Sequence, residues 1–230
     1  MLTCLGRTIR LVSFDLDDTL VETFGSIPAR IRAAIRDAPL PVVPDDDRIV
    51  AIIRAVLDGD PSARPARLVA EIGLTQGDPL AGRLIRAYST DTASIEAVAG
   101  AREVLEALST QVRIAVVTNG GNGGYARQAA KLERHGFDRL VDVVMVPWAP
   151  ETRKPGPAMF QRLCELTGVP ATEAVHVGDS LATDVAGANA AGFGSVLYRG
   201  SAPEEDADPA PLPDATIGHL RALLSLLGPP

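Results

Sequence analysis

The sequence predicts an α/β fold in which an open, mostly parallel sheet carries helices on both faces and an all-helical segment follows the first strand. Three observations support this prediction. Short, mostly apolar runs rich in β-branched residues recur along the chain, as in buried parallel strands. Helical patterns lie between most of these runs, and such alternation is typical of a parallel sheet. One long interval, residues 21–98, contains helical patterns alone.

Five runs are predicted to be strands. They are LVSF at 11–14, VRIAVV at 112–117, VDVVMV at 141–146, AVHV at 174–177 and SVLY at 195–198. Apolar residues at successive rather than alternate positions indicate that both faces of each strand are covered.

Helical patterns are expected around these strands. GAREVLEALS at 100–109 precedes the second strand, YARQAAKLERHG at 125–136 follows it, and PAMFQRLCELTG at 157–168 follows the third. After a loop rich in proline and acidic residues, a last amphipathic helix is expected at roughly 217–227.

The interval after the first strand is predicted to be a helical insertion. Its amphipathic stretches are separated by clusters such as PVVPDDD and DGDPSARP, and they are IPARIRAAIRDA, DRIVAIIRAVLDG and PLAGRLIRAYST. We therefore expect two domains, a core formed by 1–20 and 99–230 and a helical domain formed by 21–98.

Composition limits the possible functions. With 230 residues, 46% of them hydrophobic, the chain can bury a full core. A net charge of -7 argues against general binding to nucleic acid or anionic membranes. Cys4 and Cys164 form neither a disulfide framework nor a zinc motif, and no leader or membrane span is evident, so a cytoplasmic protein is expected. Monomer and homodimer remain open.

Three carboxylates directly follow the first predicted strand, in DLDDTL at 15–20. Ligands of such sheets bind at the carboxyl ends of the strands. Asp15, Asp17 and Asp18 can be read as residues that merely end the strand and cap a turn. They can also form a hard-cation site, because Mg²⁺ offsets the repulsion among clustered carboxylates. A calcium loop fits poorly, since it requires glycine where Leu20 stands.

Polar side chains occur at the ends of other predicted strands. Thr118 and Asn119 end the second strand, Lys154 lies in the loop after the third, and Asp179 and Asp184 follow the fourth. Each alone has an ordinary structural interpretation as a turn, a solvated side chain or a helix start. Their joint occurrence at one edge of the sheet favours a functional site.

Lysine is rare in this chain, because only Lys131 and Lys154 among 22 basic residues are lysines. An ammonium is a compact point charge that can contact a carboxylate and a phosphoryl oxygen together, which favours a specific role for Lys154. Lys131 lies on a predicted helix face and has no evident role.

In the order and context of these motifs, the chain resembles the haloacid dehalogenase superfamily. DLDDTL at 15–20 resembles the first motif of that superfamily, Thr118-Asn119 the second, Lys154-Pro155 the third and GDSLATD at 178–184 the fourth. The resemblance implies a Rossmann-like core, and the insertion at 21–98 matches the position of a helical cap.

The resemblance also implies roles for the matching residues. Asp15 would be the nucleophile that accepts the phosphoryl group as an aspartyl-phosphate, and Asp17 would be the general acid and base. Thr118 and the backbone of Asn119 would bind phosphoryl oxygens, and Lys154 would neutralise charge that develops there.

A Mg²⁺ site is implied in the same way. Asp15, the backbone carbonyl of Asp17 and Asp179 would hold the ion. Asp184 would lie outside this ligand set and orient Lys154 or a metal-bound water.

Asp17 also distinguishes reactions within the superfamily. The dehalogenase branch needs no acid for its leaving group and no metal, and its counterpart of Asp17 is not aspartate, so hydrolysis of a small phosphorylated metabolite is favoured. Phosphonatase and sugar-phosphate mutase activities remain alternatives. The substrate is open among sugar phosphates, nucleoside monophosphates and phosphoglycolate-like acids.

Two other protein classes compete with this interpretation. Gly121, Gly123 and Ala126 satisfy a dinucleotide-binding fingerprint, but Asp142, about 20 residues later, lies near the start of a strand rather than its end. A phospho-acceptor signalling module also gathers carboxylates, threonine and lysine at strand ends. Such a module is a compact single domain, whereas the insertion here and an acid–base group at Asp17 favour turnover.

Several polar residues are expected to have structural roles. His135, His176 and His219 are not assigned to catalysis, and His176 is expected to pack beneath the loop after its strand. Thr19 is expected to support the first motif by hydrogen bonding, and Asp18 has no assigned catalytic role.

Overall fold

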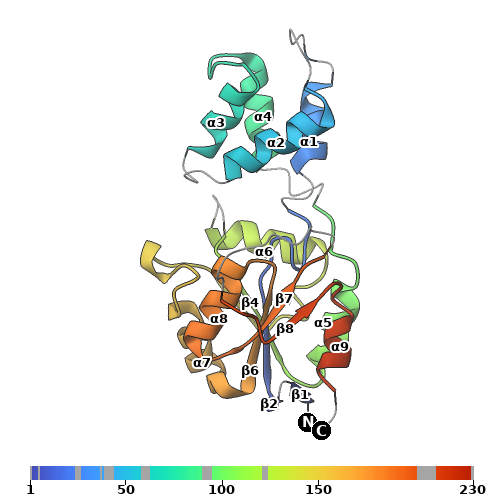
Figure 1. Cartoon of the computed structure of the whole chain (residues 1–230), viewed down its shortest axis with the longest axis vertical. Coiled ribbons are helices and arrows are strands. Elements are labelled where there is room, and N and C mark those ends of the chain that lie inside the picture. Colours follow the sequence, from blue (N-terminus) through green and yellow to red (C-terminus); the bar gives the residue numbers. More distant parts are fainter. Residues whose placement is uncertain are drawn as a thin grey trace. The chain divides into compact units, whose positions relative to one another are not determined.

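The structure, a computed structural model, describes residues 2–4, 6–23, 27–36, 38, 44–57, 63–89, 95–120, 124–200 and 211–228. The chain divides into two compact units, which we call the core unit (Met1–Val21 with Ala97–Pro230) and the helical unit (Glu22–Glu96) (Figure 1). No helix in the described ranges is long and apolar enough to cross a membrane.

The core unit contains a six-stranded sheet in which all neighbouring strands are parallel. In spatial order the strands are β5 (Val143–Met145), β4 (Arg113–Val117), β3 (Leu11–Phe14), β6 (Ala174–Gly178), β7 (Gly194–Tyr198) and β8 (Ala215–Ile217). This arrangement confirms the predicted α/β class. All four residues of β3 are buried, as expected for a strand covered on both faces.

Three strands were not predicted from the sequence. A short antiparallel pair, β1 (Leu2–Cys4) and β2 (Arg7–Ile9), lies at the N-terminus. The expected helix at 217–227 is shorter than predicted, because Ala215–Ile217 pairs with β7 as the edge strand β8. The helix itself, α9, comprises only Ala222–Leu226.

Helices cover both faces of the sheet. The core-unit α-helices are α5 (Ala101–Ser109), α6 (Gly124–Arg134), α7 (Ala158–Thr167), α8 (Ala186–Ala191) and α9. Helices α7 and α8 lie on one face, and α5 and α9 pack together on the other (Figure 1). The ring of Phe160, on α7, meets that of Phe193 edge to face at 5.2 Å between centroids within a continuous apolar cluster.

The helical unit has its own apolar core. Its helices are α1 (Ile27–Ile35), α2 (Asp46–Leu57), α3 (Arg64–Glu71) and α4 (Pro79–Ser89). Isoleucine, leucine and valine side chains from all four helices form one buried cluster. Helix α3 was missed because Arg64 and Pro65 were assigned to a loop; proline is tolerated in the first turn of a helix, where its missing N–H has no intrahelical partner.

Candidate active site

The predicted site residues lie at the carboxyl ends of three neighbouring strands. Asp15 follows β3, Thr118 follows β4 and Asp179 follows β6, while Lys154 reaches the same edge from the loop after β5. Strand β3 lies between β4 and β6, so the chain connections run to opposite sides of the sheet at its carboxyl end. Ligands of open α/β sheets bind at such a point.

The ammonium of Lys154 lies between two carboxylates. It donates to Asp15 Oδ1 at 2.6 Å, to Asp184 Oδ1 at 2.5 Å and to the backbone carbonyl of Val117 at 2.6 Å. Its side chain is 2% exposed, so these three acceptors replace water for the three N–H groups. Burial alone would lower the pKa of Lys154, but the two carboxylates raise it, and the ammonium stays charged.

Asn119 fixes the loop that carries Lys154. Its side-chain Nδ2 donates to the backbone carbonyl of Lys154 at 3.0 Å, and its Oδ1 accepts from the Lys154 backbone N–H at 2.8 Å. The neighbouring Thr118 is buried, and its hydroxyl accepts from the N–H of Gly120 at 3.3 Å. The Asn119 side chain therefore has a scaffolding role in addition to any binding by its backbone.

Asp15, Asp179 and Asp184 form a carboxylate cluster in which one oxygen from each lies within 4.8 Å of the others. Burial, together with the charges of Asp184 and Asp17, raises the pKa of Asp15 to about 7 against the opposing effect of Lys154. Restricted access of water and the charges of Asp15 and Asp184 also raise the pKa of Asp179. Its side chain is nevertheless at the exposed rim, where water moderates the shift. A divalent cation would oppose both shifts, so the donor set fits Mg²⁺.

Asp184 is buried beneath this cluster. Its Oδ2 accepts from the backbone N–H of Ser180 at 3.1 Å, and its Oδ1 lies 3.3 Å from His176 Nε2 as well as contacting Lys154. Burial alone would raise the pKa of Asp184, but Lys154 and His176 hold it below its usual range. Position 178 requires glycine, because a Cβ there would lie 2.3 Å from Asp184 Cγ.

His176 packs below the site. Its Nδ1 lies 2.9 Å from Ser13 Oγ, and its Nε2 faces Asp184. Burial lowers the pKa of His176, so the ring is neutral near pH 7. These contacts agree with the expected structural role. His135 follows α6 and His219 precedes α9, both outside the strand ends that form the site.

Lys131 contacts Asp17, although the sequence analysis found no role for this lysine. Its Nζ, on α6, donates to Asp17 Oδ1, and its side chain is 2% exposed while that of Asp17 is 14% exposed. Both lysines of the chain therefore neutralise carboxylates of the first motif. The available signal was the rarity of lysine itself, which was applied to Lys154 alone.

The loop of the first motif is held by backbone geometry. Asp18 has a φ of 59°, a left-handed conformation that aspartate tolerates better than most residues, and its N–H donates to the carbonyl of Val21 at 2.7 Å. The expectation for Thr19 was wrong: within the described residues its buried hydroxyl has no hydrogen-bond partner. The loop is closed instead by main-chain bonds such as Leu20 N–H to Leu16 carbonyl at 3.0 Å.

The residues of the competing dinucleotide fingerprint do not form such a site in the described ranges. Gly121 and Gly123 lie outside those ranges. Asp142 is at the start of β5, where its carboxylate accepts from the N–H of Ile114 at 2.8 Å and pairs with Arg113 at 3.0 Å. These bonds place it at the amino end of the strands, away from a ribose site.

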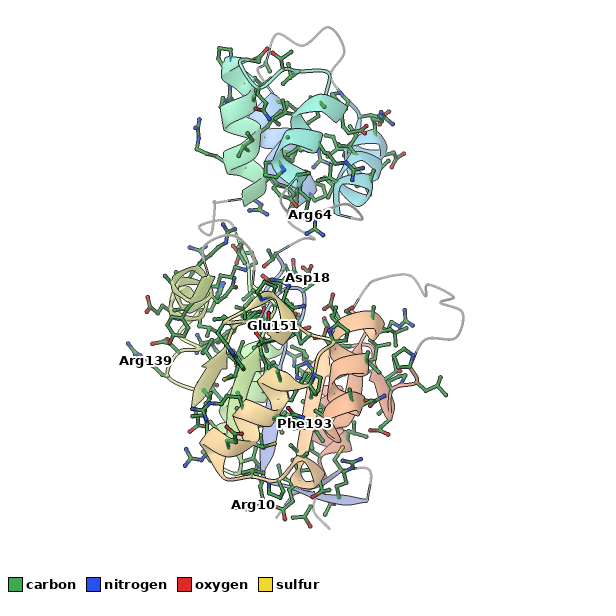
Figure 2. All side chains as sticks on the ribbon, turned by 90° about the vertical axis from the view of Figure 1, so that its left-hand side faces the viewer. Arg10, Asp18, Arg64, Arg139, Glu151 and Phe193 are labelled. Atoms are coloured by element: carbon green, nitrogen blue, oxygen red, sulfur yellow. The ribbon has the colours of Figure 1, made fainter. Side chains whose placement is uncertain are left out.

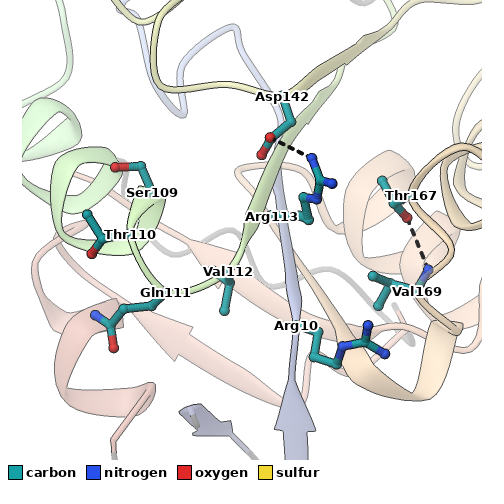
Figure 3. Close-up of a pocket in the computed structure, with 9 residues that line it drawn as sticks. All are labelled: Arg10, Ser109, Thr110, Gln111, Val112, Arg113, Asp142, Thr167 and Val169. Atoms are coloured by element: carbon teal, nitrogen blue, oxygen red, sulfur yellow. Dashed lines mark hydrogen bonds and ion pairs between the residues drawn. The ribbon is translucent and has the colours of Figure 1, made fainter.

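A hollow of about 450 Å³ also lies at the amino ends of the strands (Figure 3). It is lined by residues that include Arg10, Arg113 and Asp142, and it contains none of the predicted site residues. Figure 2 labels Arg10 at this end of the core unit and Asp18 at the opposite end. The predicted site residues therefore lie at the carboxyl edge, away from this hollow.

The carboxyl edge combines the groups needed to transfer a phosphoryl group. Asp15 is a carboxylate in contact with one ammonium, and Asp17 is a second carboxylate two residues away in contact with another. Lys154 supplies a positive charge, and the clustered carboxylates of Asp15 and Asp179 are of the kind that divalent cations bind. Such an arrangement stabilises negative charge that develops on transferred oxygens.

Comparison with known proteins places this arrangement in context. The family model for haloacid dehalogenase-like hydrolases matches residues 9–192. The chain is 41% identical over 112 residues to ribulose-1,5-bisphosphate 5-phosphatase of Halopiger xanaduensis, a match that spans 48% of this chain and 44% of that protein. It is 27% identical to glyceraldehyde 3-phosphate phosphatase of Pyrococcus furiosus over 96% of this chain and 94% of that protein.

Solved structures show the same fold. The HAD-hydrolase YfnB of Bacillus subtilis, crystallised bound to magnesium, superposes with a TM-score of 0.75 at 22% identity. The superposition covers 97% of this chain and 100% of that one. At this level of identity the similarity concerns the fold.

Proposed function

Since the chain belongs to the haloacid dehalogenase-like hydrolases, we propose that it is a Mg²⁺-dependent phosphatase that hydrolyses a small phosphorylated metabolite through an aspartyl-phosphate. The observation that carries the proposal is the separate neutralisation of two carboxylates: Lys154 contacts Asp15, and Lys131 contacts Asp17. One carboxylate can then attack while the other exchanges a proton.

In the first step, an Asp15 oxygen attacks phosphorus and the bond to the ester oxygen breaks. Asp17 enters this step protonated on its other oxygen, Oδ2, and gives that proton to the departing alcohol oxygen, so no alkoxide has to leave. Lys154 and the Thr118 hydroxyl offset charge on the phosphoryl oxygens. The products of this step are a free alcohol and a phosphorylated Asp15.

In the second step, water attacks the phosphorus of the acyl phosphate. Asp17, now ionised, accepts a proton from that water, and the bond between phosphorus and the Asp15 oxygen breaks. Inorganic phosphate leaves, and both carboxyl groups return to their initial states. A sugar-phosphate mutase would instead pass the phosphoryl group to a second hydroxyl.

Asp15, Asp179 and the backbone carbonyl of Asp17 would hold Mg²⁺, with Asp184 orienting Lys154 from below. When bound, the ion would neutralise carboxylate charge and attract the phosphate. The exposed position of Asp179 leaves one face of the cluster open for an ion to enter.

The helical unit, Glu22–Glu96, is proposed to act as a cap that selects the substrate. Its own apolar core allows it to move as a body, and closure over a site commonly excludes water. The two curated relatives are named for phosphatases of a bisphosphorylated pentulose and a three-carbon sugar, so phosphorylated sugars are the first substrates to test. A cytoplasmic location and a monomeric or homodimeric state belong to the same proposal.

The decisive experiment measures phosphate release from a panel of phosphate monoesters with Mg²⁺ and with EDTA. We expect Mg²⁺-dependent release that Asp15→Asn lowers by on the order of a thousandfold or more, because the nucleophile is lost. Asp17→Asn should also lower turnover strongly. Substantial activity in folded Asp15→Asn would contradict the mechanism.

Asp18→Asn provides a matched control. It removes a carboxylate from the same loop, and asparagine also tolerates the left-handed conformation of Asp18. We expect this variant to keep most of the wild-type activity. Product analysis separates the alternatives: a mutase would yield an isomeric phosphate, and a phosphonatase would cleave a carbon–phosphorus bond.

A further inference from the structure

The buried face of α6 carries polar side chains where a core helix would ordinarily carry apolar ones. Gln128 is fully buried and Lys131 is 2% exposed, three positions apart on the same face. A Cβ built on Gly120 would lie 3.6 Å from Gln128 Nε2, so this face lies against the loop that follows β4. The polar face of α6 is thus directed toward the carboxyl edge of the sheet.

Lys131 is not explained by packing. A leucine or methionine would fill a buried helical position without the cost of removing an ammonium from water or of ordering a long side chain. A buried ammonium is tolerated when a carboxylate compensates its charge, and that carboxylate is Asp17. The presence of Lys131 therefore indicates that the carboxylate of Asp17 requires a cation beside it.

We propose that Lys131 is a positioning residue for Asp17: by holding Oδ1 of this carboxylate, it fixes the direction in which Asp17 exchanges a proton with the leaving alcohol. The proposal rests on the phosphatase function described above. Asp17 is on a loop rather than in β3, and its side chain is partly open to solvent, so its rotation needs a restraint. A contact to one oxygen fixes the plane of the carboxylate and hence the direction of the other oxygen.

The geometry separates Lys131 from Lys154. Lys154 contacts Asp15 and Asp184, approaching from the loop after β5, whereas Lys131 contacts Asp17 from α6. Loss of Lys131 should therefore impair proton transfer while leaving the nucleophile in place. A small displacement of an acid or base is enough to lower the rate greatly.

Dependence on the leaving group tests this inference. The ratio kcat/KM covers the steps up to departure of the alcohol, and an alkyl alcohol needs a proton far more than a nitrophenolate does. For Lys131→Met we expect kcat/KM to fall about 10- to 100-fold with a sugar phosphate and less than about threefold with p-nitrophenyl phosphate. Equal losses on both esters would overturn the inference.

A double-mutant cycle tests whether Lys131 acts through Asp17. In an Asp17→Asn background, Lys131→Met should cause no further loss on the sugar phosphate. A loss as large as in the wild-type background would overturn the inference, because it would mean an independent role. Arg134→Met, which removes an exposed cation from the same helix, should match the wild type on both esters.

Two further measurements keep the result interpretable. Circular dichroism and thermal melting establish that Lys131→Met is folded; should it unfold, Lys131→Arg retains the charge, and partial rescue of the sugar-phosphate rate is expected. Failure of rescue in folded Lys131→Arg, together with equal losses on both esters, would overturn the inference. A wild-type protein inactive on all esters would overturn the proposed function itself, whereas an active enzyme indifferent to Lys131 would overturn this inference alone.

Discussion

Replacing Lys154 by methionine should destabilise the metal-free protein by an amount that grows with pH. The substitution keeps most of the side-chain volume but removes the ammonium that contacts Asp15 and Asp184. Removing one partner of a buried ion pair typically costs about 3–5 kcal/mol, because the remaining charge is uncompensated. Asp184, which is 2% exposed in its side chain, is the carboxylate most affected.

Protonation of the variant limits this loss. The free-energy cost of protonating a carboxylate with an ordinary pKa near 4 rises by about 1.4 kcal/mol for each pH unit above that pKa. This cost is about 2 kcal/mol at pH 5.5 and about 5 kcal/mol at pH 8. In wild type the folded-state pKa of Asp184 is lowered, so Asp184 gives stability that is present above pH 4 and is lost only at lower pH. In the variant its folded pKa would be raised, so the folded state binds more protons and stability falls as pH rises.

Urea unfolding in EDTA at the two pH values measures this effect. We expect Lys154→Met to lose about 2 kcal/mol at pH 5.5 and about 3–5 kcal/mol at pH 8 relative to wild type. Arg153→Met, an exposed neighbour, should lose little at either pH. Equal losses at both pH values, or a loss below about 1 kcal/mol at pH 8, would refute the assignment of Lys154 as the cation that compensates Asp184.

Two further predictions concern the cation site and the buried histidine. Asp179→Asn should weaken the apparent affinity for Mg²⁺, measured from the rise in melting temperature with Mg²⁺ concentration, about tenfold, because it removes a proposed metal ligand. It should not lower the melting temperature in EDTA, because it also removes one repelling charge. An unchanged Mg²⁺ titration would contradict the proposed ligand set. Burial lowers the folded-state pKa of His176, so below pH 6.5 the unfolded chain binds a proton at this residue that the folded protein does not bind. His176 therefore reduces the free energy of unfolding as pH falls, with a slope of at most about 1.4 kcal/mol per pH unit. His176→Asn should remove that component from the pH dependence of urea unfolding between pH 5 and 7, and an identical slope in both proteins would argue against it.

The fold could be predicted where each segment contains its own signal. The strands around the site are buried on both faces, so their sequences are apolar throughout, and β3 is the clearest case. The short edge strand β8 could not be predicted, because three residues with one exposed position carry almost no periodicity. Helix α3 was hidden by Pro65, which is a helix breaker in the interior but is compatible with a first turn.

The candidate site could be predicted where its residues come directly after strands in the sequence. Asp15, Thr118 and Asp179 follow strands that are neighbours in the sheet, so the order of motifs along the chain was enough to group them. The contact between Lys131 and Asp17 had no such signal. It depends on the rotation of α6 about its axis, which side-chain packing decides and the local sequence does not state.

The two lysines of the site compensate some of its carboxylates and not others. Asp15 and Asp184 share Lys154, and Asp17 has Lys131, so these carboxylates are compensated before any ion is bound. Within the described residues no ammonium or guanidinium pairs with Asp179. Of the three clustered carboxylates, Asp179 is therefore the one whose charge is left uncompensated by the described side chains, and it is also the one at the exposed rim.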